Sequence, residues 1–283
     1  MVTDQRKKTE NSAPVLWVIA TPIGNLSDFS ARACEVLQQV DEVLAEDTRH
    51  SKRLLSEYNI SKPVSALHEH NETARIDALV TQMHAGKSFA LLSDAGTPLV
   101  SDPGYRLVRA CGEAELLVST VPGACAAIAA LSVAGLPSDQ FHFYGFLPGK
   151  ANARRQQLQT LDNQQGSLIF YESPRRLIAT LEDMFAVFGS DREACLCREM
   201  TKQFETIRRL PLQKLLAWVK EDTNQQRGEI VIVVSGNSED RQTVPAEMVD
   251  LYRSLADVFP PAKVAAIMAR HLPIKKADLY ASR

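Results

Sequence analysis

Short apolar runs that alternate with helical segments constrain the fold of this sequence more than any other feature. Each run spans five or six residues and is followed by a turn signal, a pattern typical of buried strands in a parallel sheet. Strands separated by helices imply crossover connections, so we predict an α/β domain over residues 15–137. Its expected strands are 15–20, 42–46, 63–67, 89–93 and 116–121, and its expected helices are 30–40, 48–58, 72–83, 105–111 and 124–134.

The composition changes after residues 135–140, which read GLPSDQ and predict a domain boundary. An aromatic run at 141–149 and three later apolar runs, with helices between them, predict a second α/β domain with a mixed sheet over residues 138–236. A polar linker at 235–243 then leads into residues 244–283, which predict a small helical domain. The three later runs are 167–173, 193–199 and 229–234.

The composition of the 283-residue chain, with 45% hydrophobic and 23% charged residues, fits a globular protein of two domains. Residues 1–14 are charged and polar, and we expect them to form a disordered tail rather than a secretory signal. No run of about 18 apolar residues occurs, so no membrane span is expected. Five cysteines without a disulfide pattern favour reduced thiols in a cytoplasmic protein. The net charge of −2 gives no argument for nucleic acid, so any RNA-binding surface has to be local.

Three loops that directly follow expected strands form the candidate ligand site. In an open parallel sheet, ligands bind outside the carboxyl ends of the strands, where Gly and Pro allow tight turns and close backbone approach. Each loop alone is more typical of a plain turn, but three of them at one sheet edge favour a pocket. Neither a GxGxxG motif nor a Walker A lysine occurs, which favours a nucleoside-like ligand without phosphates. The loops are 21–25, 93–98 with its continuation 101–104, and 122–124.

Eight segments, in order along the chain, resemble the tetrapyrrole methylase superfamily and, within it, the ribosomal RNA small subunit methyltransferase I family. The resemblance covers about residues 15–236, and its most specific parts are SDAGTP followed by SDPG, and EDTR at the second expected strand. The family often has proline where Ala124 stands. The segments are ATPIGNLSD (20–28), EDTRHSKRLL (46–55), HEHNE (68–72), LLSDAGTPLVSDPG (91–104), VPGACAA (121–127), GFLPGK (145–150), FYESPRR (170–176) and REMTKQFE (198–205).

This resemblance implies a fold, a cofactor and an activity. The fold is two α/β domains of tetrapyrrole-methylase type, with S-adenosylmethionine in the cleft between them, in a homodimer. The activity is 2′-O-methylation of a cytidine ribose in the decoding region of 16S rRNA, on the small ribosomal subunit. The segment FYESPRR adds Tyr171 to the cofactor candidates from the three loops. The candidate cofactor residues are Pro22, Gly24, Asn25, Ser93, Asp94, Ala95, Gly96, Thr97, Pro98, Pro122, Gly123 and Tyr171.

Four residues are candidates for the catalytic step. Glu46 and Asp47 end the second expected strand, at the edge that carries the cofactor loops, and strand alternation turns only one of them toward the cleft. Asp47 opens the loop and is our first choice for removing the 2′-hydroxyl proton, provided that partial burial raises its pKa. It equally suits the N-cap of the next helix. Arg49 would orient the acceptor or its phosphate. Lys202, in a segment resembling the family's RE-x-TK motif, is the rival base if desolvation keeps it neutral.

Basic residues gather in the second domain and in the C-terminal segment. In the second domain they lie beside aromatic strand ends, which favours an RNA surface over a solvated face. Those in the C-terminal segment suggest a role in holding the ribosome. The pairs His68 with His70 and Cys195 with Cys197 lack further ligands at suitable spacing, so no metal is expected. The candidate RNA residues are Lys150, Arg154, Arg155, Arg175 and Arg176, and the C-terminal ones are Lys263, Arg270, Lys275 and Lys276.

Two alternatives to an rRNA methyltransferase stay open. The same fold allows a tetrapyrrole C-methyltransferase, although a small macrocycle would not need the basic second domain and tail. The other alternative is a non-catalytic, ribosome-associated module that binds the cofactor. Methyl transfer from labelled cofactor to small subunits separates an enzyme from a binding module.

Overall fold

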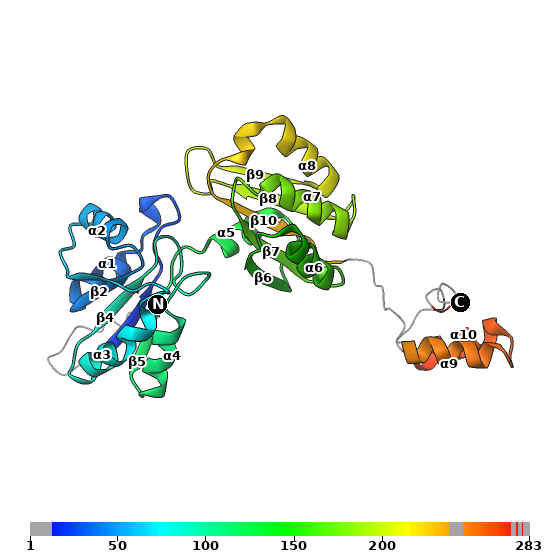
Figure 1. The fold of residues 1–283 in the computed structure, drawn as a ribbon, viewed down its shortest axis with the longest axis horizontal. Helices are drawn as coiled ribbons and strands as arrows, with labels where there is room; N and C mark the ends of the chain where they lie inside the picture. Colours follow the sequence, from blue (N-terminus) through cyan, green and yellow to red (C-terminus); the bar gives the residue numbers. More distant parts are fainter. Residues whose placement is uncertain (1–12, 238–245, 273–275, 277–278, 280–283) are drawn as a thin grey trace, which may run out of the picture.

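The computed structural model describes residues 13–237 and 246–272, together with Lys276 and Leu279. Within these residues, two five-stranded sheets follow one another along the chain, and a pair of helices comes after them (Figure 1). The predicted fold class, α/β with two sheets and a helical C-terminal region, is confirmed. The limits expected for each domain stay a prediction. Most of the expected N-terminal tail, residues 1–12, and Lys275 lie outside the described residues.

The first sheet contains the strands β1 (Val15–Ile19), β2 (Glu42–Ala45), β3 (Val64–Ala66), β4 (Phe89–Leu92) and β5 (Leu117–Val121). Its helices are η1 (Leu26–Asp28), α1 (Ala31–Gln39), α2 (Thr48–Glu57), α3 (Glu72–His84) and α4 (Tyr105–Glu113). The strand order is β3-β2-β4-β1-β5, and every pairing is parallel, as the sequence predicts. Helices α1 and α2 pack on one face, and α3 and α4 on the other. This covering of both faces explains why the strands read as continuous apolar runs.

The second sheet contains β6 (Phe141–Phe146), β7 (Ser167–Glu172), β8 (Glu193–Arg198), β9 (Thr206–Pro211) and β10 (Ile230–Val234). Its helices are α6 (Ala151–Leu161), α7 (Leu177–Phe188), α8 (Leu212–Glu221) and η2 (Thr223–Gln226). The order is β6-β7-β10-β8-β9, with β6 and β7 parallel and the remaining pairings antiparallel, so the expected mixed sheet is confirmed. Helices α6, α7 and α8 cover one face through a leucine-rich core.

Strand β9 is a strand that the sequence did not reveal. It forms the edge of the second sheet and pairs with β8 alone. Its middle residues Ile207, Arg208 and Arg209 are exposed, so it lacks the apolar run by which the other strands are recognised. Charged edge strands of this kind resist pairing with other chains.

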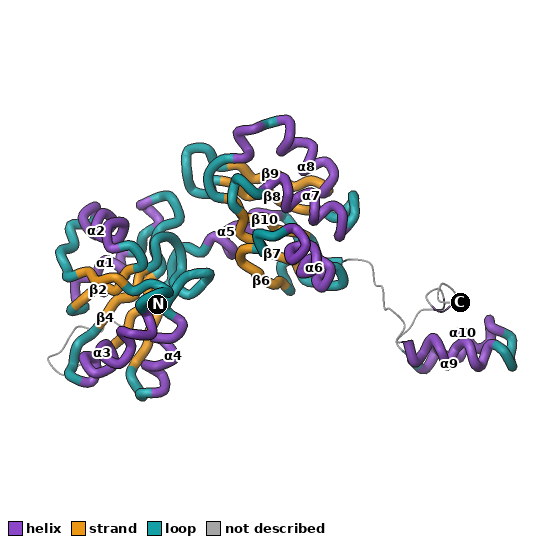
Figure 2. Tube along the Cα trace, viewed as in Figure 1, coloured by secondary structure: helices purple, strands orange, loops and turns teal. Residues whose placement is uncertain are grey.

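Helix α5 (Ala126–Ala134) links the two sheets. It follows β5 of the first sheet, yet it packs on the second sheet against Ile169, Cys195 and Val233. Its small side chains allow this close approach to the sheet. We call the first sheet with its helices the first half of the molecule, and the second sheet with its helices the second half. The loops at the carboxyl edge of the first sheet therefore lie next to the second half (Figure 2).

Helices α9 (Ala246–Ala256) and α10 (Pro261–His271) form the C-terminal pair. They share a small core in which Tyr252 packs with Val264 and Met268. None of the helices in the described part of the chain is long and apolar enough to span a membrane.

Candidate active site

The three predicted loops meet at the carboxyl edge of the first sheet. The loops after β1 and β4 are joined by a two-way backbone bridge, from Thr21 N to Gly96 O at 2.8 Å and from Gly96 N to Thr21 O at 3.1 Å. The hydroxyl of Thr97 donates to the carbonyl of Ala124 at 3.0 Å, which ties in the loop after β5. The backbone at this edge is therefore fixed by hydrogen bonds rather than left as separate turns.

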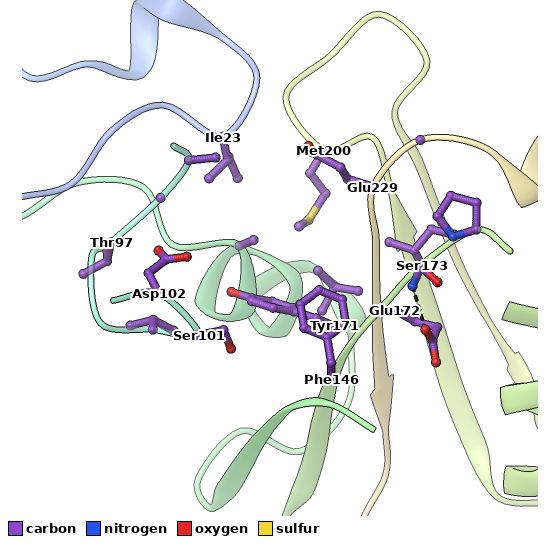
Figure 3. A pocket seen from close by; sticks show the side chains of 18 residues that line it. Ile23, Thr97, Ser101, Asp102, Phe146, Tyr171, Glu172, Ser173, Met200 and Glu229 are labelled. Carbon is purple, nitrogen blue, oxygen red and sulfur yellow. Dashed lines mark hydrogen bonds between the residues drawn. The ribbon is translucent and has the colours of Figure 1, made fainter. Parts of the chain in front are cut away.

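A cavity of about 380 Å³ lies between these loops and the second sheet (Figure 3). This volume falls in the usual range for a small-molecule site. The first half contributes polar groups from the loop after β4, and the second half contributes an apolar wall together with Glu172, Ser173 and Glu229. The residues that line it are Ile23, Ala95, Gly96, Thr97, Val100, Ser101, Asp102, Ala126, Phe146, Tyr171, Glu172, Ser173, Pro174, Met200, Gly228, Glu229, Ile230 and Val231.

The predicted cofactor residues divide into lining and supporting positions. Ala95, Gly96, Thr97 and Tyr171 line the cavity. Ser93 is buried behind them and its hydroxyl donates to the Gly96 carbonyl at 3.2 Å. The remaining candidates lie outside the lining: Pro22, Gly24, Asn25, Asp94, Pro98, Pro122 and Gly123.

Two of these supporting residues have clear local roles. Asn25 is the N-cap of η1, with its side chain accepting from Ser27 N. A Cβ on Gly24 would lie 2.5 Å from Cγ of Lys202, so glycine is needed for the second half to approach this loop.

The aromatic wall comes from β6 and β7. The hydroxyl of Tyr171 accepts a hydrogen bond from Ala127 N at 3.2 Å, in the first turn of α5. Burial raises the pKa of Tyr171 to about 12, so it stays protonated. Phe146 packs edge-on against Tyr171, with ring centroids 5.7 Å apart, and remains 58% exposed at the cavity. The sequence predicts Tyr171 as a cofactor residue but not Phe146 or Met200, because only the tertiary arrangement brings those two to the cavity.

Asp47 occupies the N-cap of α2, one of the two roles expected for it. Its carboxylate accepts from Arg49 N at 2.8 Å and pairs with the Arg49 guanidinium at 2.8 Å. These hydrogen bonds hold the pKa of Asp47 well below its usual range, so the condition set for Asp47 as the base, a raised pKa, is not met. Asp47 also lies outside the cavity lining.

Three further carboxyl groups cluster beside the cavity. Asp94 accepts from the backbone N of Asp47 at 3.1 Å. Burial, followed by repulsion from Asp94, raises the pKa of Glu46. The pKa of Asp102 is likewise raised, to about 6: burial is the largest cause, the charges of Glu46 and Asp94 add to it, and a hydrogen bond from the Ser93 hydroxyl opposes it. Asp102 lies in the SDPG continuation of the predicted loop, although it is not among the individually named candidate residues.

Lys202 is anchored in the second half by two carboxylates. Its Nζ lies 2.9 Å from Glu199 and 2.8 Å from Glu229. Burial alone would lower the pKa of Lys202, but the hydrogen bonds to Glu229 and Glu199 outweigh it and raise that pKa. The condition set for Lys202 as a base, a neutral amine, is therefore not met.

The candidate RNA residues differ sharply in exposure. The prediction that Arg154 contacts RNA needs correction, because its side chain is only 5% exposed. It pairs instead with the buried Asp183 at 2.6 Å. Arg155 shares the same carboxylate but is 56% exposed. Arg176 pairs with the buried Glu172 at 2.7 Å. Lys150 and Arg175 are exposed. In the described residues, no cluster of three or more His, Cys, Asp or Glu side chains could hold a metal.

A family model matches residues 15–216 of this chain, the model of the tetrapyrrole (corrin/porphyrin) methylases. The chain belongs to this family of methylases. Among its relatives, proteins named ribosomal RNA small subunit methyltransferase I are similar along almost their whole length. The one from Escherichia coli O157:H7 is 47% identical over 276 residues, covering 98% of this chain and 96% of the relative. The one from Pseudomonas aeruginosa strain PAO1 is 50% identical over 271 residues, covering 95% and 96%.

Solved structures with the same fold are more distant. The uroporphyrin-III-C-methyltransferase of Thermus thermophilus has a TM-score of 0.54 at 18% identity, over 85% of this chain and 98% of that one. The methyltransferase CobJ has a TM-score of 0.58 at 16% identity, over 80% and 95%. At this identity the likeness concerns the fold alone.

Proposed function

We propose that this chain transfers a methyl group from S-adenosylmethionine to the ribose 2′-hydroxyl of a cytidine in the decoding region of 16S rRNA, acting on the small ribosomal subunit. The observation that carries the proposal is near-full-length identity of 47–50% to relatives named ribosomal RNA small subunit methyltransferase I, combined with the cavity between the two halves. We further propose that it works in the cytoplasm as a homodimer.

The cavity suits this cofactor in size and chemistry. Gly96, at φ +84°, brings its backbone to the cavity wall, and Ala95 and Thr97 flank it. Tyr171, Met200 and Val231 form an apolar wall for the adenosine and methionine parts. S-adenosylmethionine supplies a methyl group activated by a positively charged sulfur. That charge matches a cavity in which, among the described residues, carboxylates occur without any lining lysine or arginine.

The chain's own task is to position the acceptor hydroxyl and to take up its proton, because the methyl group arrives already activated. Holding the reactants in line and excluding water supplies much of the acceleration. Of the four catalytic candidates, we keep Arg49, whose side chain is 90% exposed, as the group that orients the acceptor phosphate. Glu46 supports the site electrostatically. Asp47 and Lys202 hold ion pairs that make both poor proton acceptors.

Recognition of RNA falls to a few exposed cations of the second half. These are Lys150, Arg175 and Arg155, while Arg154 and Arg176 hold the second half together. The C-terminal helices add Lys263, Arg270 and Lys276. Because the net charge is only −2, affinity for generic RNA is weak and a structured subunit should be a far better substrate than free 16S rRNA.

The test is methyl transfer from radiolabelled S-adenosylmethionine to small subunits that lack the modification. We expect label in 16S rRNA, and nuclease digestion should place it on the ribose of one cytidine. Label on a tetrapyrrole substrate instead would favour the C-methyltransferase alternative. Cofactor binding without transfer to either substrate would favour a non-catalytic module.

A further inference from the structure

Asp102 stands out among the acidic residues of the cavity. Three carboxylates line it, and two of them are already paired: Glu172 with Arg176 and Glu229 with Lys202. In the part of the chain that the structure describes, no lysine or arginine pairs with Asp102. Its carboxylate points into the cavity, on the side opposite Glu172 (Figure 3).

The backbone holds Asp102 in place from both halves of the molecule. Leu99 and Ser101 adopt φ values of +74° and +68°, conformations that side chains rarely take and that surrounding structure has to enforce. Behind the loop, a Cβ on Gly104 would lie 2.6 Å from Leu91. Across the cavity, a Cβ on Gly145 of β6 would lie 2.9 Å from the Ser101 hydroxyl. The loop is therefore packed tightly on both sides.

The groups that face Asp102 come from three strand ends. Glu46 at the end of β2 and Asp94 after β4 bring negative charge, and the Ser93 hydroxyl is within hydrogen-bonding reach. Tyr171 of β7 faces it from the second half and stays neutral. Burial and the two neighbouring carboxylates place the pKa of Asp102 at about 6. It is thus ionised at neutral pH and is a stronger base than an ordinary aspartate.

We infer that Asp102 accepts the proton of the acceptor hydroxyl, with Glu46 and Asp94 as the positioning residues beside it. The inference rests on the proposed function. As the hydroxyl oxygen bonds to the methyl carbon, its proton passes to a carboxylate oxygen of Asp102. The electron pair of the broken methyl–sulfur bond stays with sulfur. One positive charge on sulfur and one negative charge on Asp102 disappear together, so the transfer creates no new charge in a poorly solvated cavity.

The first test measures the proton directly, without turnover. Carboxyl ¹³C NMR of protein labelled at aspartate should show one signal that titrates near pH 6. That signal should vanish in Asp102→Asn. In Glu46→Gln it should titrate at lower pH, because a neighbouring negative charge is gone. A signal near pH 6 that persists in Asp102→Asn, or that does not move in Glu46→Gln, overturns the electrostatic part of the inference.

The second test is single-turnover methyl transfer to small subunits, with cofactor and subunit affinities measured in parallel. Asp102→Asn should slow transfer by at least about 100-fold, with both affinities retained. The matched control is Asp77→Asn, an exposed aspartate on α3 away from the cavity, which should transfer at the wild-type rate. The wild-type rate should rise with pH through about 6 and then level off, and this midpoint should shift to lower pH in Glu46→Gln.

Each outcome has a distinct meaning. Wild-type protein that transfers no methyl group to subunits defeats the proposed function itself. Wild-type transfer with an equally fast Asp102→Asn leaves that function standing and overturns the inference. A variant that only loses cofactor affinity, with normal transfer at saturation, makes Asp102 a binding residue instead. Loss of transfer in Asp47→Asn with a normal Asp102→Asn assigns the proton to Asp47. If Asp102→Asn fails to fold, the pH shift in Glu46→Gln decides.

Discussion

The two halves of the molecule contribute to the cavity in opposite ways. The first half offers polar loops at the carboxyl edge of a parallel sheet, where Gly96 and Asp102 present backbone and carboxylate. The second half offers side chains from the faces and ends of a mixed sheet, above all Phe146, Tyr171 and Met200. The first half therefore positions reactive groups through its backbone, and the second half shapes the cavity through packed side chains. Substitutions in the two halves should therefore fail in different ways.

The largest effect is expected in the second half, at a cation that looks like an RNA contact in the sequence. Arg154→Met removes the buried partner of Asp183, and should lower the free energy of unfolding by about 3 kcal/mol in urea denaturation. The exposed Arg175→Met should stay within about 0.5 kcal/mol of wild type. Instead, it should weaken binding to small subunits. Equal stability of the two variants would remove the distinction between structural and RNA-facing cations.

In the first half, a substitution at Gly96 tests whether the backbone there binds the cofactor. Gly96→Val forces a side chain onto φ +84° at the cavity wall, within 3.4 Å of Ile23, and should lower cofactor affinity by about 100-fold or more in calorimetry. The control is Gly86→Val, at φ +97° in open space after α3, which carries similar strain away from the cavity. If both folded variants bind the cofactor like wild type, the cofactor site lies elsewhere.

The sequence predicted the first half more fully than the second. Parallel strands buried on both faces leave apolar runs, and their carboxyl ends must share one edge, so the meeting of loops 21–25, 93–98 and 122–124 followed from pattern alone. The edge strand β9, with exposed Arg208 and Arg209, leaves no such run. Whether a charged side chain is buried depends on partners distant in sequence, as Asp183 shows for Arg154.

In the candidate site, too, the sequence did not reveal which charged side chains are paired with one another. Asp47 and Lys202 have the right residue types near the right strand ends, but their ion-pair partners could not be known from the sequence. Asp102 did carry a signal, since it stands in the SDPG continuation of a recognised loop. Its neighbours Glu46 and Asp94, and the absence of a lysine or arginine partner among the described residues, emerge only in three dimensions.

A smaller effect should test the aromatic wall of the second half. Phe146 is exposed at the cavity, and a nucleobase stacked on its ring would gain about 1–3 kcal/mol. Phe146→Ala should therefore raise KM for small subunits by about tenfold with little change in cofactor affinity, and Phe146→Trp should restore it. Phe141→Ala, on the same strand but outside the cavity lining, is the control. An unchanged KM in Phe146→Ala would rule out this stacking role.

The smallest expected effect is a pH-dependent change in the free energy of unfolding, caused by Asp102 of the first half. The pKa of Asp102 is raised in the folded state to about 6, above an unfolded value near about 3.9, so its ionisation opposes folding as pH rises between these values. Asp102→Asn should therefore be more stable than wild type by about 1–2 kcal/mol at pH 7. The difference should fade toward pH 4, and Asp77→Asn should show neither effect. A variant that is less stable than wild type at pH 7 would contradict the assignment of an unpaired, half-buried charge.

One structure can show directly what each half contributes to binding the cofactor and the acceptor. Cryo-electron microscopy of the protein bound to a small subunit, with S-adenosylhomocysteine present, would locate cofactor and acceptor together. We expect the spent cofactor against Gly96, the target ribose beside Asp102, and the cytosine ring against Phe146. A target ribose or cofactor on another face of the molecule, away from the cavity between the two sheets, would contradict the account.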